Sequence, residues 1–266
     1  MFHADAAVKG GRAGPIYHLH IFYQDFHVSY YSTMMYNKHE RKKEHSIFMK
    51  RSSGILMHIS SLPSPYGIGT LGRDAYAFAD FLAETGQTYW QMLPLGPTGF
   101  GDSPYQCASA FAGNPYLIDL DLLVEDGLLL PEELQGVDWG ADPARVDYGR
   151  IFQHRRDVLY QAFLRGRARD AKAVAAFRSA QGAWLEGYAL FSAVKEHFGL
   201  RPFHEWDDDI RLHTEEAVAR YRAMLCEAID YHCYVQFLFY RQWNALRAYL
   251  QEKGLRVIGD LPIYVP

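Results

Sequence analysis

Residues 54–97 read GILMHISSLPSPYGIGTLGRDAYAFADFLAETGQTYWQMLPLGP, and this stretch decides the fold class. Two apolar runs, at 54–60 and 88–95, are typical of short buried strands, and each is followed by a turn rich in Gly and Pro. Between them, residues 73–86 place apolar side chains at helical spacing, and Gly86 is suited to end a helix. A strand, a helix and a strand joined by short turns predict a parallel α/β sheet.

A third strand of the same sheet is predicted near the end of the sequence, where the apolar run LRVIGDLPIYV occupies residues 255–265. Far more residues separate it from the second strand than an ordinary connection requires. Their periodicity is mostly helical, most clearly over 215–252. We therefore expect an incomplete α/β domain over 49–266, with a mostly helical subdomain at about 120–230 inserted between its second and third strands.

Composition argues against several classes of function. The 266 residues are 49% hydrophobic and 22% charged, as in a folded globular protein, and the net charge of −4 offers no basic surface for nucleic acid. No apolar run reaches the roughly 18 residues that a membrane-spanning helix needs. Three scattered cysteines without a CxxC pair indicate neither a disulfide framework nor a zinc site. We expect no metal and no cofactor, and a cytoplasmic location.

Residues 1–48 differ from the rest of the chain, because they hold six of the twelve histidines and the charged run HERKKEH. We interpret them as an atypical extension without a stable fold. The alternative is a metal-binding appendage, since His18 and His20 would share one face of a strand. Met49 opens the stretch MKRSSGILMHISSLP, which is typical of a natural start.

The loop GFGDSPYQ, at 99–106, carries residue types that bind sugars. Its glycines permit close approach of the backbone to a ligand, and its proline stiffens the turn. Phe100 and Tyr105 offer flat faces for pyranose rings, while Ser103 and the Tyr105 hydroxyl offer hydrogen-bond partners. The alternative interpretation is a rigid structural turn.

Other polar residues have both a structural and a functional interpretation. Asn114, in an Asn-Pro turn signal, is suited either to sugar hydroxyls or to its own backbone. We interpret His58, on the first predicted strand, as a histidine with satisfied hydrogen bonds and not as a catalytic base. Asp119 and Asp121 are expected to cap a helix or face solvent. The aspartates at 207–209 are expected to form a solvated turn, because three adjacent aspartates cannot all face one ion.

Three long blocks stand out in the chain from about residue 52 onward. They are RSSGILMHISSLPSPYGIGTLG, WQMLPLGPTGFGDSPYQCASAFAGNPYLIDLDLLVEDGLL and FLFYRQWNALRAYLQEKGLRVIGDLPIYV. In sequence and in order, they resemble the amylomaltases, the 4-α-glucanotransferases of the α-amylase clan. The resemblance implies the N-terminal part of a (β/α)8 TIM barrel, with a large mostly helical insertion between the second and third strands. It also implies an enzyme that transfers α-1,4-glucan segments between maltooligosaccharides by a retaining double displacement.

The resemblance also implies which residues bind substrate. Tyr105 matches the family tyrosine that stacks on the sugar at the cleavage site, and Ser103 lies in the same donor-side loop. Phe100 stands where many relatives have tyrosine, in a position linked to a second glucan contact. Tyr148 matches another aromatic residue of that secondary groove, and Asn114 completes the predicted substrate-binding set.

The same resemblance places the catalytic groups outside this sequence. The family's nucleophilic aspartate, general acid glutamate and transition-state-stabilising aspartate are expected beyond residue 266. The family's substrate-binding aspartate of the third strand is expected a little after Asp260, which is therefore interpreted as a structural residue. We expect a truncated 4-α-glucanotransferase that is inactive alone, with α-1,4-glucans and maltooligosaccharides as partners. The alternative is a non-catalytic glucan-binding or partner-binding fragment.

Overall fold

The computed structural model describes residues 51–142 and 144–262. The expectations for residues 1–48, including the metal-binding alternative at His18 and His20, lie outside the described residues. The same holds for the last residues of the third predicted strand.

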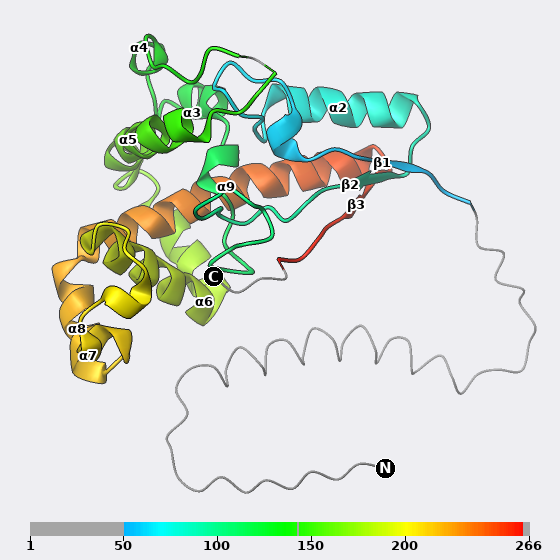
Figure 1. Ribbon diagram of the computed structural model, residues 1–266. Helices are drawn as coiled ribbons and strands as arrows, with labels where there is room; N and C mark the ends of the chain where they lie inside the picture. The colour runs from blue at the N-terminus through cyan, green and yellow to red at the C-terminus, as the bar shows by residue number, and fades with distance from the viewer. Residues whose placement is uncertain (1–50, 143, 263–266) are drawn as a thin grey trace, which may run out of the picture. The chain divides into compact units, whose positions relative to one another are not determined.

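The predicted parallel sheet is confirmed. Strands β1 (Gly54–Leu56), β2 (Tyr89–Gln91) and β3 (Arg256–Ile258) lie side by side in the order β1-β2-β3, and both pairs are parallel (Figure 1). In the middle row of the register, Ile55 is opposite Trp90, which is opposite Val257 on its other side. These three side chains belong to the main hydrophobic core.

The strands are much shorter than the sequence predicts over 54–60, 88–95 and 255–265. Past its carboxyl end, each ladder extends by one further bond, from the Met57 amide to the Gln91 carbonyl and from the Met92 amide to the Ile258 carbonyl. After β2 and β3, proline limits the ladder, because it has no amide hydrogen to donate. Pro94 follows β2 by three positions, and Pro262 follows β3 by four. The first predicted strand instead continues into a short 3-10 turn, η1 (Ile59–Ser61).

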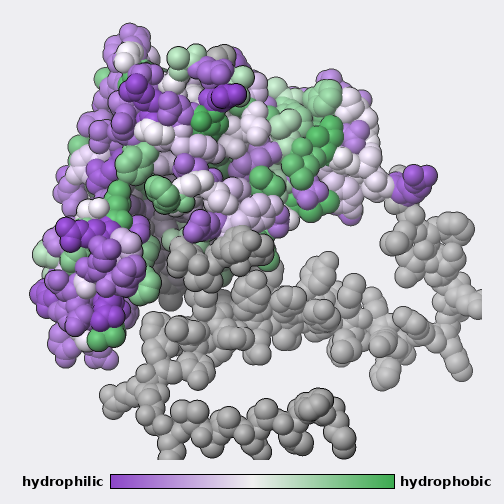
Figure 2. Space-filling view, viewed as in Figure 1, coloured by the Kyte–Doolittle hydropathy of each residue, from purple (hydrophilic) through white to green (hydrophobic). Residues whose placement is uncertain are grey.

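Two helices cover one face of the sheet. Helix α2 (Arg73–Glu84) confirms the helix predicted over 73–86, and its Phe78 ring lies 4.9 Å from the ring of Trp90. Helix α9 (Cys226–Glu252) packs against α2, where the Tyr249 hydroxyl donates to the Asp80 carboxylate at 2.7 Å. On the opposite face Leu56 and Ile258 are exposed. Figure 2 shows hydrophobic residues gathered over the end of the molecule that α2 and the sheet form.

The segment between β2 and β3 is mostly helical, as its periodicity predicts. Its remaining helices are α3 (Leu120–Glu125), α4 (Pro131–Leu134), α5 (Tyr148–Gly166), α6 (Ala171–His197), α7 (Asp208–Arg211) and α8 (Glu215–Met224), with 3-10 turns η2 (Pro115–Leu117) and η3 (Phe203–Glu205). Side-chain oxygens of Asp119, Asp147 and Thr214 accept backbone amides at the starts of α3, α5 and α8, as N-caps do.

The helical pattern over 215–252 is confirmed, with one interruption at Leu225 that separates α8 from α9. One local prediction in this segment is wrong. The aspartates expected to form a solvated turn instead begin α7, where acidic side chains favour the positive end of the helix dipole.

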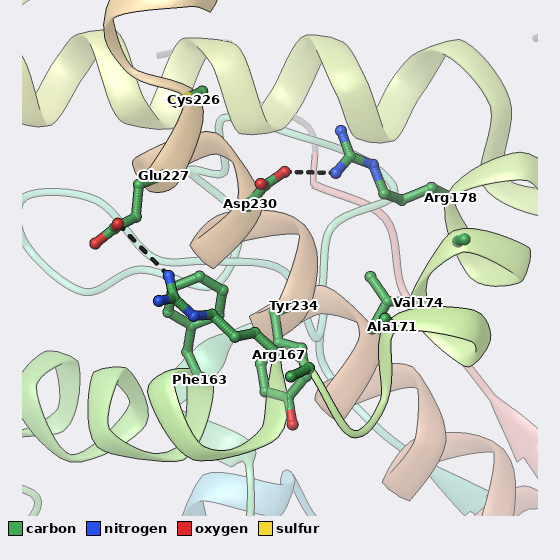
Figure 3. A pocket seen from close by; sticks show the side chains of 11 residues that line it. Phe163, Arg167, Ala171, Val174, Arg178, Cys226, Glu227, Asp230 and Tyr234 are labelled. Atoms are coloured by element: carbon green, nitrogen blue, oxygen red, sulfur yellow. Dashed lines mark hydrogen bonds and ion pairs between the residues drawn. The ribbon is translucent and has the colours of Figure 1, made fainter.

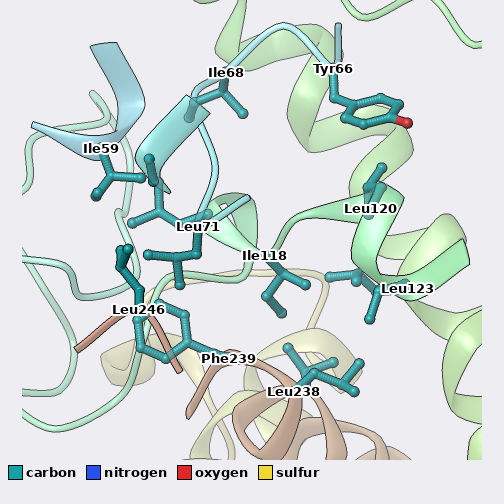
Figure 4. Packing of buried hydrophobic residues seen from close by; sticks show 14 of the residues in the cluster. Ile59, Tyr66, Ile68, Leu71, Ile118, Leu120, Leu123, Leu238, Phe239 and Leu246 are labelled. Carbon is teal, nitrogen blue, oxygen red and sulfur yellow. The ribbon is translucent and has the colours of Figure 1, made fainter. Parts of the chain in front are cut away.

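Helix α9 joins two hydrophobic cores. Its first half contributes Ile229 and Cys233 to a cluster with α6 and α8. Its second half contributes Leu238 and Leu246 to the main cluster beneath the sheet (Figure 4). A helix of 27 residues spans about 40 Å, which is long enough to serve both cores.

Two buried glutamines of α9 hold the chain that follows β2. The Gln236 side chain accepts from the Gly113 amide at 2.7 Å and donates to the Gly113 carbonyl at 2.9 Å. The Gln242 side chain does the same with Asp119, at 2.8 and 3.0 Å. Gly113 allows this approach, because a Cβ atom there would lie 2.0 Å from the ring of Phe239.

We expect Gln236→Leu to lower the free energy of unfolding by about 2–4 kcal/mol, because it leaves the buried amide and carbonyl of Gly113 without partners. The control is Gln251→Leu, at an exposed position of the same helix, which should change the free energy by less than about 0.5 kcal/mol. Urea unfolding of both variants measures the difference. Equal stabilities of the two variants would contradict this role of Gln236.

Candidate functional site

The candidate site lies where the loop after β2 meets the chain leaving β3. Both strands end at the same edge of the parallel sheet, and ligand sites of such sheets lie at the carboxyl ends of the strands. An isolated antiparallel bridge between Thr98 and Cys107 closes the base of the loop. The buried Cys107 thiol donates to the Ser109 carbonyl at 2.8 Å, and burial raises the pKa of that thiol.

Tyr105 and Asp260 meet at this edge. The Tyr105 hydroxyl donates to Oδ2 of Asp260 at 2.8 Å, although 155 positions separate the two residues. This hydrogen bond is the main reason that the pKa of Tyr105 is raised, since a phenolate would lie against a carboxylate. Asp260, interpreted from the sequence as a structural residue, is therefore a direct partner of the best candidate for a sugar contact.

The tip of the loop leaves one aromatic ring free. Phe100 is fully exposed, and Asp102 and Gly101 after it both have positive φ angles. The Ser103 hydroxyl accepts from the Tyr105 amide at 3.3 Å, so it stabilises the turn from inside the loop. The loop thus presents Phe100 to solvent while its own hydrogen bonds hold the backbone.

The charge of Asp102, in the same loop, acts on Tyr148 and Tyr116. Burial first, and the Asp102 charge second, raise the pKa of Tyr148 and raise that of Tyr116 to about 12. Tyr148 is half-buried at the start of α5 and hydrogen-bonds Ser60, which follows β1. Burial also raises the pKa of Asp102. Sequence reasoning missed Asp102, although an acidic residue in a Gly-rich loop was a signal that could have identified it.

Asn114 and the aspartates after it serve the backbone. Asn114 is buried, and its Oδ1 accepts from the Tyr116 amide at 2.9 Å. Of the two predicted partners, sugar hydroxyls or its own backbone, the side chain therefore bonds the backbone. Asp119 caps α3 as expected, but it is buried and also accepts the Thr70 hydroxyl at 2.6 Å. Asp121 accepts the hydroxyl of Tyr66.

A buried arginine supports this segment, and sequence reasoning missed it. Arg155 is 1% exposed, donates Nη1 to the Ile118 carbonyl at 3.2 Å, and lies 5.2 Å from the centre of the Trp139 ring. Burial lowers its pKa to about 10, so the guanidinium remains charged at neutral pH. Within the described residues, its Nε and Nη2 have no hydrogen-bond partner. The helical pattern gave no signal, because an arginine on a helix is usually exposed.

His58 lies just after β1, near the same edge of the sheet. The expectation that its hydrogen bonds are satisfied is wrong, because Nδ1 is buried without a partner in the described part of the chain. Burial lowers the pKa of His58 to about 4. The imidazole is therefore neutral at pH 7.

A cavity of about 430 Å³ lies elsewhere, between α5, α6 and the start of α9 (Figure 3). Its charged groups are paired with each other, Arg178 with Asp230 at 2.6 Å and Arg167 with Glu227 at 3.5 Å. The residues predicted to bind sugar do not line it.

Two further kinds of site are absent from the described part of the chain. No three His, Cys, Asp or Glu side chains gather as a metal site there, and none of its helices has the length and apolar character of a membrane-spanning helix.

The fold and the loop define a parallel α/β protein with its candidate ligand site at the carboxyl ends of the strands. A family model described as 4-alpha-glucanotransferase (Glyco_hydro_77) matches residues 57–266. The chain therefore belongs to the 4-alpha-glucanotransferase family, as the sequence blocks indicate.

Relatives and solved structures agree with this membership. The chain is 48% identical over 218 residues to a 4-alpha-glucanotransferase of Streptococcus pneumoniae, and 46% identical over 221 residues to that of Thermus thermophilus. These alignments cover 81% and 82% of this chain but 43% of each relative, so the chain spans less than half the length of these relatives. An amylomaltase from Streptococcus agalactiae in complex with acarbose has a TM-score of 0.79 at 49% identity, over 81% of this chain and 44% of that one.

The neutral state of His58 predicts a pH dependence of stability. The pKa of His58 is about 4 in the folded chain, whereas that of an unfolded histidine is about 6.5. Between pH 4 and pH 6.5 the unfolded chain therefore binds more protons than the folded chain. The stabilisation is complete above about pH 6.5 and is lost as the pH falls to about 4, by up to about 3 kcal/mol. His58→Gln should reduce the loss of stability between pH 7 and 4.5 in urea unfolding, whereas Gln251→Leu, which removes no titratable group, should leave that loss unchanged. An unchanged loss in His58→Gln would contradict the assignment.

Thiol labelling tests the burial of the three cysteines. Cys226 is exposed, whereas Cys107 and Cys233 are buried, and burial raises the pKa of Cys233 to about 12. We expect one thiol to react rapidly with an aromatic disulfide at pH 8 and three to react in denaturant. Cys226→Ser should abolish the rapid phase. Rapid labelling of two or more thiols in the folded protein would show that the loop base or α9 is packed differently.

Proposed function

We propose that the chain provides part of the glucan-binding site of a 4-α-glucanotransferase that transfers α-1,4-glucan segments between maltooligosaccharides. The observation that carries the proposal is the loop 99–106, which presents aromatic rings and hydroxyls at the carboxyl ends of the parallel strands in a chain of this family. The acarbose complex of the similar amylomaltase supports a carbohydrate ligand.

The proposed chemistry needs two carboxyl groups about 5–5.5 Å apart, one to attack the anomeric carbon and one to protonate the departing oxygen. A sugar hydroxyl then takes the place of water and resolves the covalent intermediate, so transfer replaces hydrolysis. Asp260 is occupied by Tyr105 and by the Leu261 amide, and we assign it no catalytic role. We propose that the catalytic carboxylates lie outside this sequence and that this chain binds and orients the glucan and shields it from water.

Each predicted binding residue has a proposed role. The Tyr105 ring stacks on the sugar next to the bond that is cleaved, and Ser103 contributes from the same turn. Phe100 and Tyr148 form a second glucan contact, in which phenylalanine keeps the stacking face but lacks the hydroxyl of a tyrosine. Asn114 contributes through its position beneath the loop, because its Oδ1 already accepts a backbone amide.

For the fold, we propose the N-terminal part of a (β/α)8 barrel over 49–266, with a helical subdomain inserted at about 120–230. One uncovered face of the sheet and the single compact unit Ser52–Pro266 support this proposal. The neighbouring amylomaltase structure supports it as well. The cytoplasmic location stays a prediction.

Calorimetric titration with maltoheptaose tests the binding role. We expect Tyr105→Ala and Phe100→Ala to weaken binding by about three- to tenfold each, because each removes one aromatic contact. Phe203→Ala is the matched control, since Phe203 is an equally large exposed ring in the helical segment. Unchanged affinity in both loop variants would contradict the proposed site.

Maltotriose disproportionation by the same chain tests whether the catalytic groups lie outside this sequence. We expect no glucose release, because the catalytic carboxylates are proposed to lie elsewhere. Measurable turnover would contradict that proposal and also the alternative of a non-catalytic glucan-binding fragment.

A further inference from the structure

We propose that Asp260 is a positioning residue for glucan binding, which holds the Tyr105 hydroxyl and thereby fixes the orientation of the Tyr105 ring. The inference rests on the proposed function of the loop and adds to it a residue on a different strand. Asp260 is not proposed to touch the reacting atoms, since it acts through Tyr105.

The carboxylate of Asp260 is itself held in place. Oδ1 accepts from the Leu261 amide at 2.8 Å, and Oδ2 accepts from the Tyr105 hydroxyl at 2.8 Å. Both oxygens therefore have a defined partner. The residue follows β3 by two positions, and the Ile258 carbonyl at the end of β3 accepts the Met92 amide from the neighbouring strand. The sheet thus determines where the carboxylate lies.

The backbone of Tyr105 is held from the opposite side. Its amide donates to the Ser103 hydroxyl, and the Gln106 amide donates to the Ser103 carbonyl at 3.2 Å. The bridge between Thr98 and Cys107 closes the loop just outside this turn. These contacts fix the main chain but leave the side-chain torsions of Tyr105 free.

The ring of Tyr105 depends on Asp260 for its orientation. Tyr105 is half-buried, but among the described residues it belongs to neither hydrophobic cluster, and its hydrogen bond to Asp260 is the directional contact of its side chain. A hydrogen bond from a phenol to a carboxylate is stronger than one between neutral groups. A side chain that is already oriented loses less conformational freedom when a ligand binds, and affinity rises accordingly.

A double-mutant cycle on this chain tests the proposal, with the dissociation constant for maltoheptaose measured by calorimetry. We expect Asp260→Ala and Tyr105→Phe each to weaken binding by about two- to tenfold. The double variant should bind no more weakly than the weaker single variant, because both changes break the same bond. Asp260→Asn keeps an oxygen acceptor and should restore part of the affinity.

Two controls separate positioning from general destabilisation. Asp208→Ala removes an exposed carboxylate that pairs with Arg211 on α7, and it should leave the affinity unchanged. The melting temperature of Asp260→Ala should stay close to that of the unsubstituted chain, since the bond to Tyr105 is exposed.

The outcomes distinguish this inference from the proposed function. Unchanged affinity in Asp260→Ala, or effects of the two substitutions that simply multiply, would overturn the positioning role while glucan binding stands. Absence of maltoheptaose binding by the unsubstituted chain would reject the proposed function, and a role for Asp260 in glucan binding with it.

Discussion

Two buried glutamines, Gln236 and Gln242, satisfy the backbone of a segment that pairs with no strand in the described part of the chain. The chain after β2 runs through the interior between Gly113 and Asp119, where each amide and carbonyl needs a partner. A glutamine side chain offers one donor and one acceptor, so each glutamine satisfies both groups of a single residue. Because both glutamines lie on α9, the path of residues 113–119 depends on the position of that helix.

Several buried polar groups support the backbone of the segment that follows the loop. Asn114 and Asp119 accept amides of the turns that follow, and Arg155 donates to the Ile118 carbonyl from beneath. At the tip, Phe100 is fully exposed, whereas Tyr105 is half-buried and donates its hydroxyl to Asp260. In the proposed glucan site, a rigid base lowers the entropy that is lost when these rings contact a ligand.

The chain covers only part of the length of its relatives, and one face of its sheet carries exposed apolar side chains. The chain covers 43% of the length of the relatives from Streptococcus pneumoniae and Thermus thermophilus. Leu56 and Ile258 lie exposed on the face opposite α2 and α9, and apolar side chains on a sheet face are normally covered. A proposed barrel would enclose that face, and the loop would then form one wall of a groove at its mouth.

The sequence by itself determined the parallel α/β class, the helix over 73–86, the helical character of the segment before β3 and the family. These follow from periodicity and from the order of long sequence blocks, which are local properties of the chain. Only the tertiary structure decided where the strands end, that Arg155 is buried, and that Asp260 meets Tyr105. It also showed that one nitrogen of His58 has no partner within residues 51–142 and 144–262. The glutamine contacts join residues 123 positions apart, and the Tyr105 contact joins residues 155 apart. Local patterns carry no record of such pairs, because they form only after the packing of α9 and the sheet has brought distant segments together.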